Sequence, residues 1–396
     1  MTSERIPIGA VLGLGVTQIV GYGTLYYSFG ILAPDMARDF GLSVEWMFGA
    51  LSAALLMGGF VSPSLGRWVD RFGAGRIMAA GSLIAALALV ACALSPNRSS
   101  FVAALIVVEV AANFVQYGAA FALLVQLSPN VAQRSITYLT LIAGFASTIF
   151  WPITTALHAH LSWQEVYLVF AGMNILVCLP VHCWLTRIAG LARRVRTASV
   201  PKIVEGSLSA GERREGFFLM VVGFSLQALV ASAVLVHMVP LLSGLGLGGV
   251  AALIATLFGP AQVASRMINM VFGRNLQPVT LAAISALLMA SSVAVLAATA
   301  PSVIGAMTFA VLFGFGNGLF SIVSGTLPLS LFGSEGYGKL QGKVMSARLI
   351  ISATAPFLLA VSLGPLGAPL SLALVALCGG AAFVAFRVIE HRSSWK

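Results

Sequence analysis

Three charged residues lie inside long apolar stretches and are the first candidates for chemistry: Glu109, Arg266 and Arg348. Within a bilayer, a charge at the centre of a helix costs roughly 2.5–3.5 kcal/mol on insertion scales. A carboxyl avoids this cost by holding a proton, so Glu109 is a candidate proton carrier or, equally, a structural partner. Arginine keeps its charge and needs a carboxylate, water or an anion. We therefore expect Arg266 to bind an anionic substrate, whereas Arg348 fits this role and a place at the cytoplasmic surface equally well.

Polar side chains accompany these charges at helical spacing. The spacing i, i+4, i+7 places three trios on single helical faces: Glu109, Asn113 and Gln116; Gln262, Arg266 and Asn269; Asn317, Ser321 and Ser324. Gln18, Tyr22 and Tyr26 follow i, i+4, i+8. Polar faces inside a membrane avoid lipid, so they line a cavity or bond neighbouring helices. The predicted substrate-binding residues are Arg266, Arg348, Gln262, Asn269, Asn317, Tyr22, Tyr26 and Asn113.

The composition places these residues in a membrane protein. Of 396 residues, 59% are apolar and 9% charged, against roughly 45–50% and about 25% in soluble proteins. The 22 Lys and Arg exceed the 12 Asp and Glu, but they are scattered singly and predict no nucleic-acid partner. The four cysteines lie in apolar runs, and no nucleotide-binding, hydrolase or metal-ligand motif is present. We expect neither an enzyme nor a cofactor or metal.

Twelve apolar stretches are each long enough for a membrane helix of about 20 residues. They cover residues 7–33, 45–64, 75–95, 101–127, 134–157, 164–186, 216–242, 248–273, 278–299, 302–331, 343–363 and 366–389. This pattern predicts an all-α integral membrane protein with twelve transmembrane helices in two pseudo-symmetric six-helix bundles. We expect an N-terminal bundle over 1–188, a cytoplasmic linker over 189–215, and a C-terminal bundle over 216–396.

The distribution of basic residues predicts the orientation. With the N-terminus inside, 20 Lys and Arg lie on the cytoplasmic side and two, Arg38 and Arg98, lie outside. This bias follows the positive-inside rule. The first apolar segment lacks a cleavage site after a short apolar core, so it is expected to be retained. We expect a multi-pass protein of the cytoplasmic or plasma membrane with both termini inside.

A loop motif connects this architecture to a family. The sequence GRWVDRFGAGR carries Gly66, Asp70, Arg71, Gly73 and Arg76, and it resembles the G-x-x-x-D-R-x-G-x-x-R signature of the major facilitator superfamily, between spans two and three. The resemblance covers the whole chain. It implies a secondary transporter working by alternating access, a substrate cavity surrounded mainly by spans one, four, seven and ten, and a gating role for the loop.

A narrower resemblance concerns the second half. The run from His237 to Arg266 is similar to the monocarboxylate-transporter and oxalate/formate-antiporter families, in which an arginine of span eight binds substrate carboxylate. The chain departs from that pattern at Gln262, where monocarboxylate carriers have an aspartate, and lacks their first-helix lysine. The expected function is transport of a small mono- or dicarboxylate, proton-coupled or exchanging, by a monomer in the lipid bilayer. Efflux of amphipathic compounds is the alternative, followed by a non-transporting receptor or scaffold.

Overall fold

A computed structural model of the chain describes residues 6–197, 203–273 and 275–393. The described residues form helices joined by short loops, with no strand among them, so the all-α prediction is confirmed. Residues 198–202 of the predicted linker lie outside the described residues. Arg5, Arg274 and Lys396, which were counted among the cytoplasmic basic residues, also lie outside the described residues.

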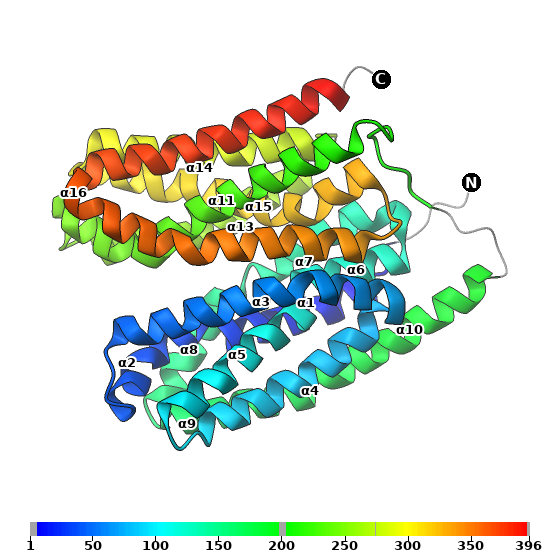
Figure 1. The fold of residues 1–396 in the computed structure, drawn as a ribbon, viewed down its shortest axis with the longest axis horizontal. Helices are drawn as coiled ribbons and strands as arrows, with labels where there is room; N and C mark the ends of the chain where they lie inside the picture. Colours follow the sequence, from blue (N-terminus) through cyan, green and yellow to red (C-terminus); the bar gives the residue numbers. More distant parts are fainter. Residues whose placement is uncertain (1–5, 198–202, 274, 394–396) are drawn as a thin grey trace. The chain divides into compact units, whose positions relative to one another are not determined.

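The chain groups into two compact units, and each is described by itself. Unit 1 comprises residues 1–205 and 334–346, and unit 2 comprises 206–333 and 347–396. The predicted bundle boundaries at 188 and 216 stay a prediction. Unit 1 contains α1 (Ile8–Tyr22), η1 (Gly23–Tyr27), α2 (Phe29–Asp39), α3 (Val44–Phe72), α4 (Ala74–Ala93), α5 (Arg98–Val115), α6 (Tyr117–Leu127), η2 (Pro129–Val131), α7 (Ala132–Ala143), α8 (Ala146–His158), α9 (Trp163–Met173), η3 (Asn174–Cys178) and α10 (Leu179–Thr197) (Figure 1).

Unit 2 contains the helices of the second half. They are α11 (Arg213–Leu242), η4 (Ser243–Leu247), α12 (Ala251–Thr256), α13 (Phe258–Phe272), α14 (Pro278–Thr299), α15 (Val303–Phe332) and most of α16 (Tyr337–Ser393). The first ten residues of α16, 337–346, belong to unit 1. Helix α16 has 57 residues, and a kink at Gly367 divides it into two helices.

Helix α16 is interrupted where two predicted spans meet. Gly367 has φ 71° and ψ 167°, a left-handed conformation that glycine adopts readily because it lacks a Cβ. Among the described residues, ten helical segments are long and apolar enough to cross a membrane, with Tyr337–Arg392 counted as one of them. The membrane character of the chain is therefore clear from its helices, whereas the number twelve stays a prediction.

The loop motif forms a tight connection between α3 and α4. Gly73 ends α3 with φ 91°, and α4 begins at the next residue. The Gln126 side chain holds this connection, because its Oε1 accepts the Ala74 N–H at 3.0 Å and its Nε2 donates to the Val69 carbonyl at 3.2 Å. The conformation at position 73 explains the second glycine of the motif, since a side chain there would be strained.

Span four is divided into two helices in unit 1. Helix α5 ends at Val115, Gln116 takes an extended conformation with ψ −170°, and α6 starts at Tyr117. Gln18 of α1 donates from Nε2 to the Val115 carbonyl at 2.6 Å, which satisfies a carbonyl at the end of α5. Discontinuous membrane helices are typical of sites where transporters bind substrates or ions.

Candidate functional site

Glu109 is buried inside unit 1. Its side chain on α5 is 3% exposed. No hydrogen-bond partner reaches its Oε1 among the described residues. The nearby titratable groups that interact with it electrostatically come from three other elements: Tyr26 of η1, Cys92 of α4 and Tyr167 of α9. A buried carboxyl with an open acceptor is the arrangement expected of a group that gains and loses a proton.

Aromatic rings gather around the first π-helical segment, η1. Tyr22 lies 4.9 Å from Tyr117 between ring centroids, Tyr26 lies 5.4 Å from Tyr27, and Tyr27 lies 6.1 Å from Trp151. Tyr26 and Trp151 remain 42% and 51% exposed. The two predicted tyrosines, Tyr22 and Tyr26, thus lie in one aromatic cluster with three further rings of unit 1.

Arg266 is fixed between two helices of unit 2. Its side chain on α13 is 3% exposed. The guanidinium donates from Nε to the Gly318 carbonyl at 3.3 Å and from Nη2 to the Ser321 hydroxyl at 2.9 Å. Helices α13 and α15 approach closely here, since a Cβ at Gly318 would overlap the Ser265 hydroxyl and the Gln262 carbonyl. The packing therefore determines where the guanidinium lies.

Arg348 belongs to the same unit and is held by aromatic rings. Its guanidinium carbon lies 4.6 Å from the centroid of Phe320 on α15 and 5.9 Å from that of Phe224 on α11. The side chain is half-buried. Both arginines thus contact one stretch of α15, residues 318–321. Arg266 precedes this helix in the chain, and Arg348 follows it.

The other predicted binding residues are divided between the units. In unit 2, Gln262 is buried, Asn269 has a buried Oδ1 without a hydrogen-bond partner among the described residues, and the Asn317 carbonyl accepts the Ser321 hydroxyl at 3.2 Å. In unit 1, Asn113 donates from Nδ2 to the Glu109 carbonyl at 3.0 Å. Each unit brings its own candidates together, and their binding roles stay predictions.

Asp70 of the loop motif holds the beginning of α16. Its Oδ1 accepts the Gly338 N–H at 2.9 Å and its Oδ2 accepts the Lys339 N–H at 2.7 Å. A carboxylate is favourable at this position because the first N–H groups of a helix lack intrahelical acceptors and carry partial positive charge. Of the motif's arginines, Arg71 lies over the Phe72 ring at 5.2 Å, and both Arg71 and Arg76 are exposed.

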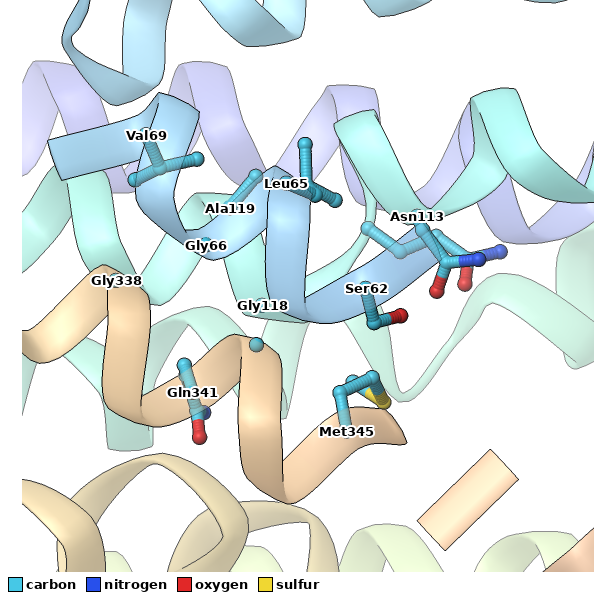
Figure 2. A pocket seen from close by; sticks show the side chains of 12 residues that line it. Ser62, Leu65, Gly66, Val69, Asn113, Gly118, Ala119, Gly338, Gln341 and Met345 are labelled. Atoms are coloured by element: carbon cyan, nitrogen blue, oxygen red, sulfur yellow. The ribbon is translucent and has the colours of Figure 1, made fainter. Parts of the chain in front are cut away.

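A cleft of unit 1 extends from this contact along α3 (Figure 2). Figure 2 shows Ser62 and Asn113 toward one end of the cleft, and Val69 and Gly338 toward the other. Gly66 and Gly342 allow α3 and the beginning of α16 to approach closely, because a Cβ on Gly342 would come within 2.5 Å of the Ser62 carbonyl. The full lining is Ser62, Leu65, Gly66, Val69, Asn113, Gln116, Gly118, Ala119, Gly338, Gln341, Gly342 and Met345.

Several of these features escaped the sequence reasoning. The cleft combines residues from three distant segments, and only the spacing Gly338-x-x-x-Gly342 signals a close helix contact in advance. No local sequence pattern indicates the rings that contact Arg348. The break at Gln116 is signalled only by Gly118, two residues later. Asn174 of η3 donates to the Thr24 hydroxyl of η1 at 3.0 Å, which joins two π-helical segments that the hydropathy pattern does not distinguish from α-helix.

Comparisons with known proteins agree with this architecture. The human organic anion transporter MFSD10 has a TM-score of 0.73 and 16% identity, over 96% of this chain and 99% of that one. The E. coli fucose:proton symporter FucP has a TM-score of 0.69 and 15% identity, over 98% and 99%. The proton:xylose symporter XylE has a TM-score of 0.70 and 14% identity, over 95% and 94%. These likenesses show the fold.

A search of curated proteins found no match, whereas a family model matches most of the sequence. The Major Facilitator Superfamily model covers residues 14–356. This match confirms the resemblance that the Asp70 loop motif predicted. It also agrees with the expectation of a carrier and not an enzyme, since the family consists of transporters. The chain belongs to the Major Facilitator Superfamily.

Proposed function

We propose that this protein is a secondary transporter of a small organic anion, a mono- or dicarboxylate, and that Glu109 carries the coupled proton. The observation that carries the proposal is the buried Arg266, whose guanidinium is positioned by Gly318 and Ser321 of α15. Arginine cannot release its charge at neutral pH, and its planar fork suits a carboxylate. A permanent buried cation is a costly feature that anion recognition would explain.

Three further observations support an anionic substrate. Arg348 supplies a second cation beside the same stretch of α15. The course from His237 to Arg266 resembles carriers of monocarboxylates and oxalate. The structural relative MFSD10 is named an organic anion transporter, whereas FucP and XylE are named sugar symporters, so sugars belong among the compounds tested.

Thermal unfolding of the purified protein with matched ligands tests the substrate class. A ligand at about 100 times its Kd stabilises the native state by about 2.7 kcal/mol. We expect small carboxylates to raise the Tm, and their neutral amides, xylose, fucose and amphipathic cations to leave it unchanged. A shift with the amphipathic compounds alone would favour the efflux alternative.

Variants of the proposed anion contact make the test specific. Arg266→Lys keeps the charge but loses the fork, so it should weaken carboxylate binding, and Arg266→Ala should remove it. The matched control is Arg67→Lys, because Arg67 is an exposed arginine whose hydrogen bond within the described part of the chain is local, to Ser64 at 2.8 Å. Retained carboxylate binding by folded Arg266→Ala, at unchanged affinity, would contradict the proposal.

A further inference from the structure

We propose that the cleft of unit 1 in Figure 2 is the route by which Glu109 exchanges its proton with water. The inference rests on the proposed function only in taking Glu109 as the proton carrier. Asn113, Gln116 and Ser62 are the positioning residues of this route, because their polar groups can hold water between the carboxyl and the cleft.

The position of the cleft along α5 is the first support. Asn113 and Gln116 line the cleft and follow Glu109 by four and seven residues, Asn113 one turn further along α5 and Gln116 directly after the end of that helix. At 1.5 Å per residue, they lie about 6 Å and about 10 Å from it along the helix axis. The Asn113 side chain also donates from Nδ2 to the backbone carbonyl of Glu109 at 3.0 Å. A few hydrogen-bonded waters can span this distance.

The two ends of the route have complementary properties. At the inner end, the Glu109 Oε1 has no hydrogen-bond partner among the described residues, although the side chain is only 3% exposed. At the other end, the two carboxylate oxygens of Asp70 accept the Gly338 and Lys339 N–H groups. The open acceptor is therefore at Glu109, and the carboxylate beside the cleft is already engaged.

The break in span four supplies polar backbone groups along the route. Gln116 interrupts the helix, and α6 begins at Tyr117 without a side-chain cap. The first N–H groups of a helix lack intrahelical acceptors, so they can bind water. Gly118, in this first turn, lines the cleft. Backbone groups of this kind are tolerated at membrane depth where they border a water-filled cavity.

Small residues keep the cleft from being filled by side chains. A Cβ on Gly118 would meet only the Met345 methyl, at 3.8 Å. The site therefore has room for a Cβ, and we expect a larger side chain to extend into the cleft. This property distinguishes Gly118 from Gly66 and Gly342, where a Cβ would meet backbone atoms of the facing helix.

The titratable groups that surround Glu109 are two tyrosines and a cysteine. Tyr26, Cys92 and Tyr167 interact with it from η1, α4 and α9. Tyrosine and cysteine ordinarily lose their protons only at alkaline pH. The cations that directly follow cleft residues in sequence are Arg67 on α3 and Lys339 and Lys343 on α16, and the Lys339 backbone already bonds Asp70.

Infrared spectroscopy of the purified protein tests the route without any substrate. The carbonyl band of a protonated carboxyl shifts when its proton is replaced by deuterium, and its absence in Glu109→Gln identifies the Glu109 band. After rapid mixing with deuterated buffer, we expect Gly118→Leu to slow this shift by about tenfold, which corresponds to one added barrier of 1.4 kcal/mol. Gly172→Leu should exchange at the wild-type rate, because Gly172 on α9 has no atom within 4 Å of its Cβ position.

Smaller changes keep the test decisive if Gly118→Leu fails to fold. Gly118→Ala adds one methyl group to the cleft. Gln116→Leu replaces a polar side chain by an apolar one of comparable size. Each variant should slow the exchange by a smaller factor than Gly118→Leu. Unchanged exchange in all folded cleft variants would overturn the proposal. Absence of a Glu109-dependent band throughout the pH range in which the protein is folded would also overturn it, while carboxylate binding through Arg266 is decided separately by thermal unfolding.

Discussion

The two units differ in the contacts that they make with their charged side chains. In unit 1, Glu109 keeps a carboxyl oxygen without a hydrogen bond from any described residue. In unit 2, Arg266 donates to a carbonyl and a hydroxyl of α15, and Arg348 lies against two aromatic rings. These contacts fix the positions of both guanidinium groups within unit 2.

Under the proposed function, this difference would correspond to separate roles for the two units. An unbonded buried carboxyl is costly when ionised, so its charge state is sensitive to small changes around it. A guanidinium cannot release its proton near neutral pH, so it keeps its charge in a fixed position, as an anion site requires. We therefore expect changes in unit 1 to affect coupling and changes in unit 2 to affect binding.

The largest effect is expected from removing the acid. Glu109→Gln has nearly the same size but cannot ionise, so uptake driven by a pH gradient in liposomes should fall to background. Exchange of labelled for unlabelled substrate moves no net proton and should persist. The substrate used is the carboxylate that gives the strongest thermal shift. Persistent pH-driven uptake would remove the proposed contrast between the units.

A steric change at the beginning of α16 should have the next largest effect. Gly342→Leu places a side chain against the Ser62 carbonyl, 2.5 Å from the Cβ position, and overpacking of this kind costs about 1–3 kcal/mol. We expect a lower Tm in detergent. The matched control is Gly364→Leu, whose Cβ position has no atom within 4 Å; equal destabilisation by both would mean that the contact with α3 is unimportant.

A change at Asp70 should loosen the same contact without a steric clash. Asn can accept one N–H but turns its amide donors toward the other, so Asp70→Asn should cost about 1–2 kcal/mol. A cysteine placed at the buried Gln341, in a protein whose exposed Cys183 is replaced, should then react faster with a thiol reagent. An unchanged labelling rate would reduce the loop to a structural turn.

The smallest effect concerns the ring contact of Arg348 in unit 2. A cation–π contact contributes about 0.5–2 kcal/mol. A double-mutant cycle with Arg348→Gln and Phe320→Leu, measured by thermal unfolding, should give a coupling energy in this range. Additive effects would show that the ring does not hold the cation.

The helical architecture was predictable because its signal is strong and local. Long apolar runs and the loop from Gly66 to Arg76 predicted an all-α member of this superfamily, and the family match and the helices confirm it. The same reasoning selected Glu109 and Arg266, because a charge in an apolar run stands out without any knowledge of its neighbours. The structure finds both of them buried.

The surroundings of these residues could not be predicted in the same way. Phe224 and Phe320 are ordinary apolar residues in sequence, and only packing brings them to Arg348. Gln116 continues an apparently regular polar face, yet the chain breaks there while the Gln18 amide supports the break from a helix 97 positions earlier in the chain. Such features depend on contacts between distant segments, which hydropathy and spacing do not encode.

The way in which Asp70 holds α16 has a consequence for tolerance to substitution. The carboxylate bonds backbone N–H groups at Gly338 and Lys339 and therefore does not require any particular side chain at 339. Homologous or engineered chains can vary residue 339 widely while keeping the interaction, provided that proline, which has no N–H, is avoided. Asp70 itself has no such freedom, so the two partners of one contact are expected to differ sharply in the substitutions they accept.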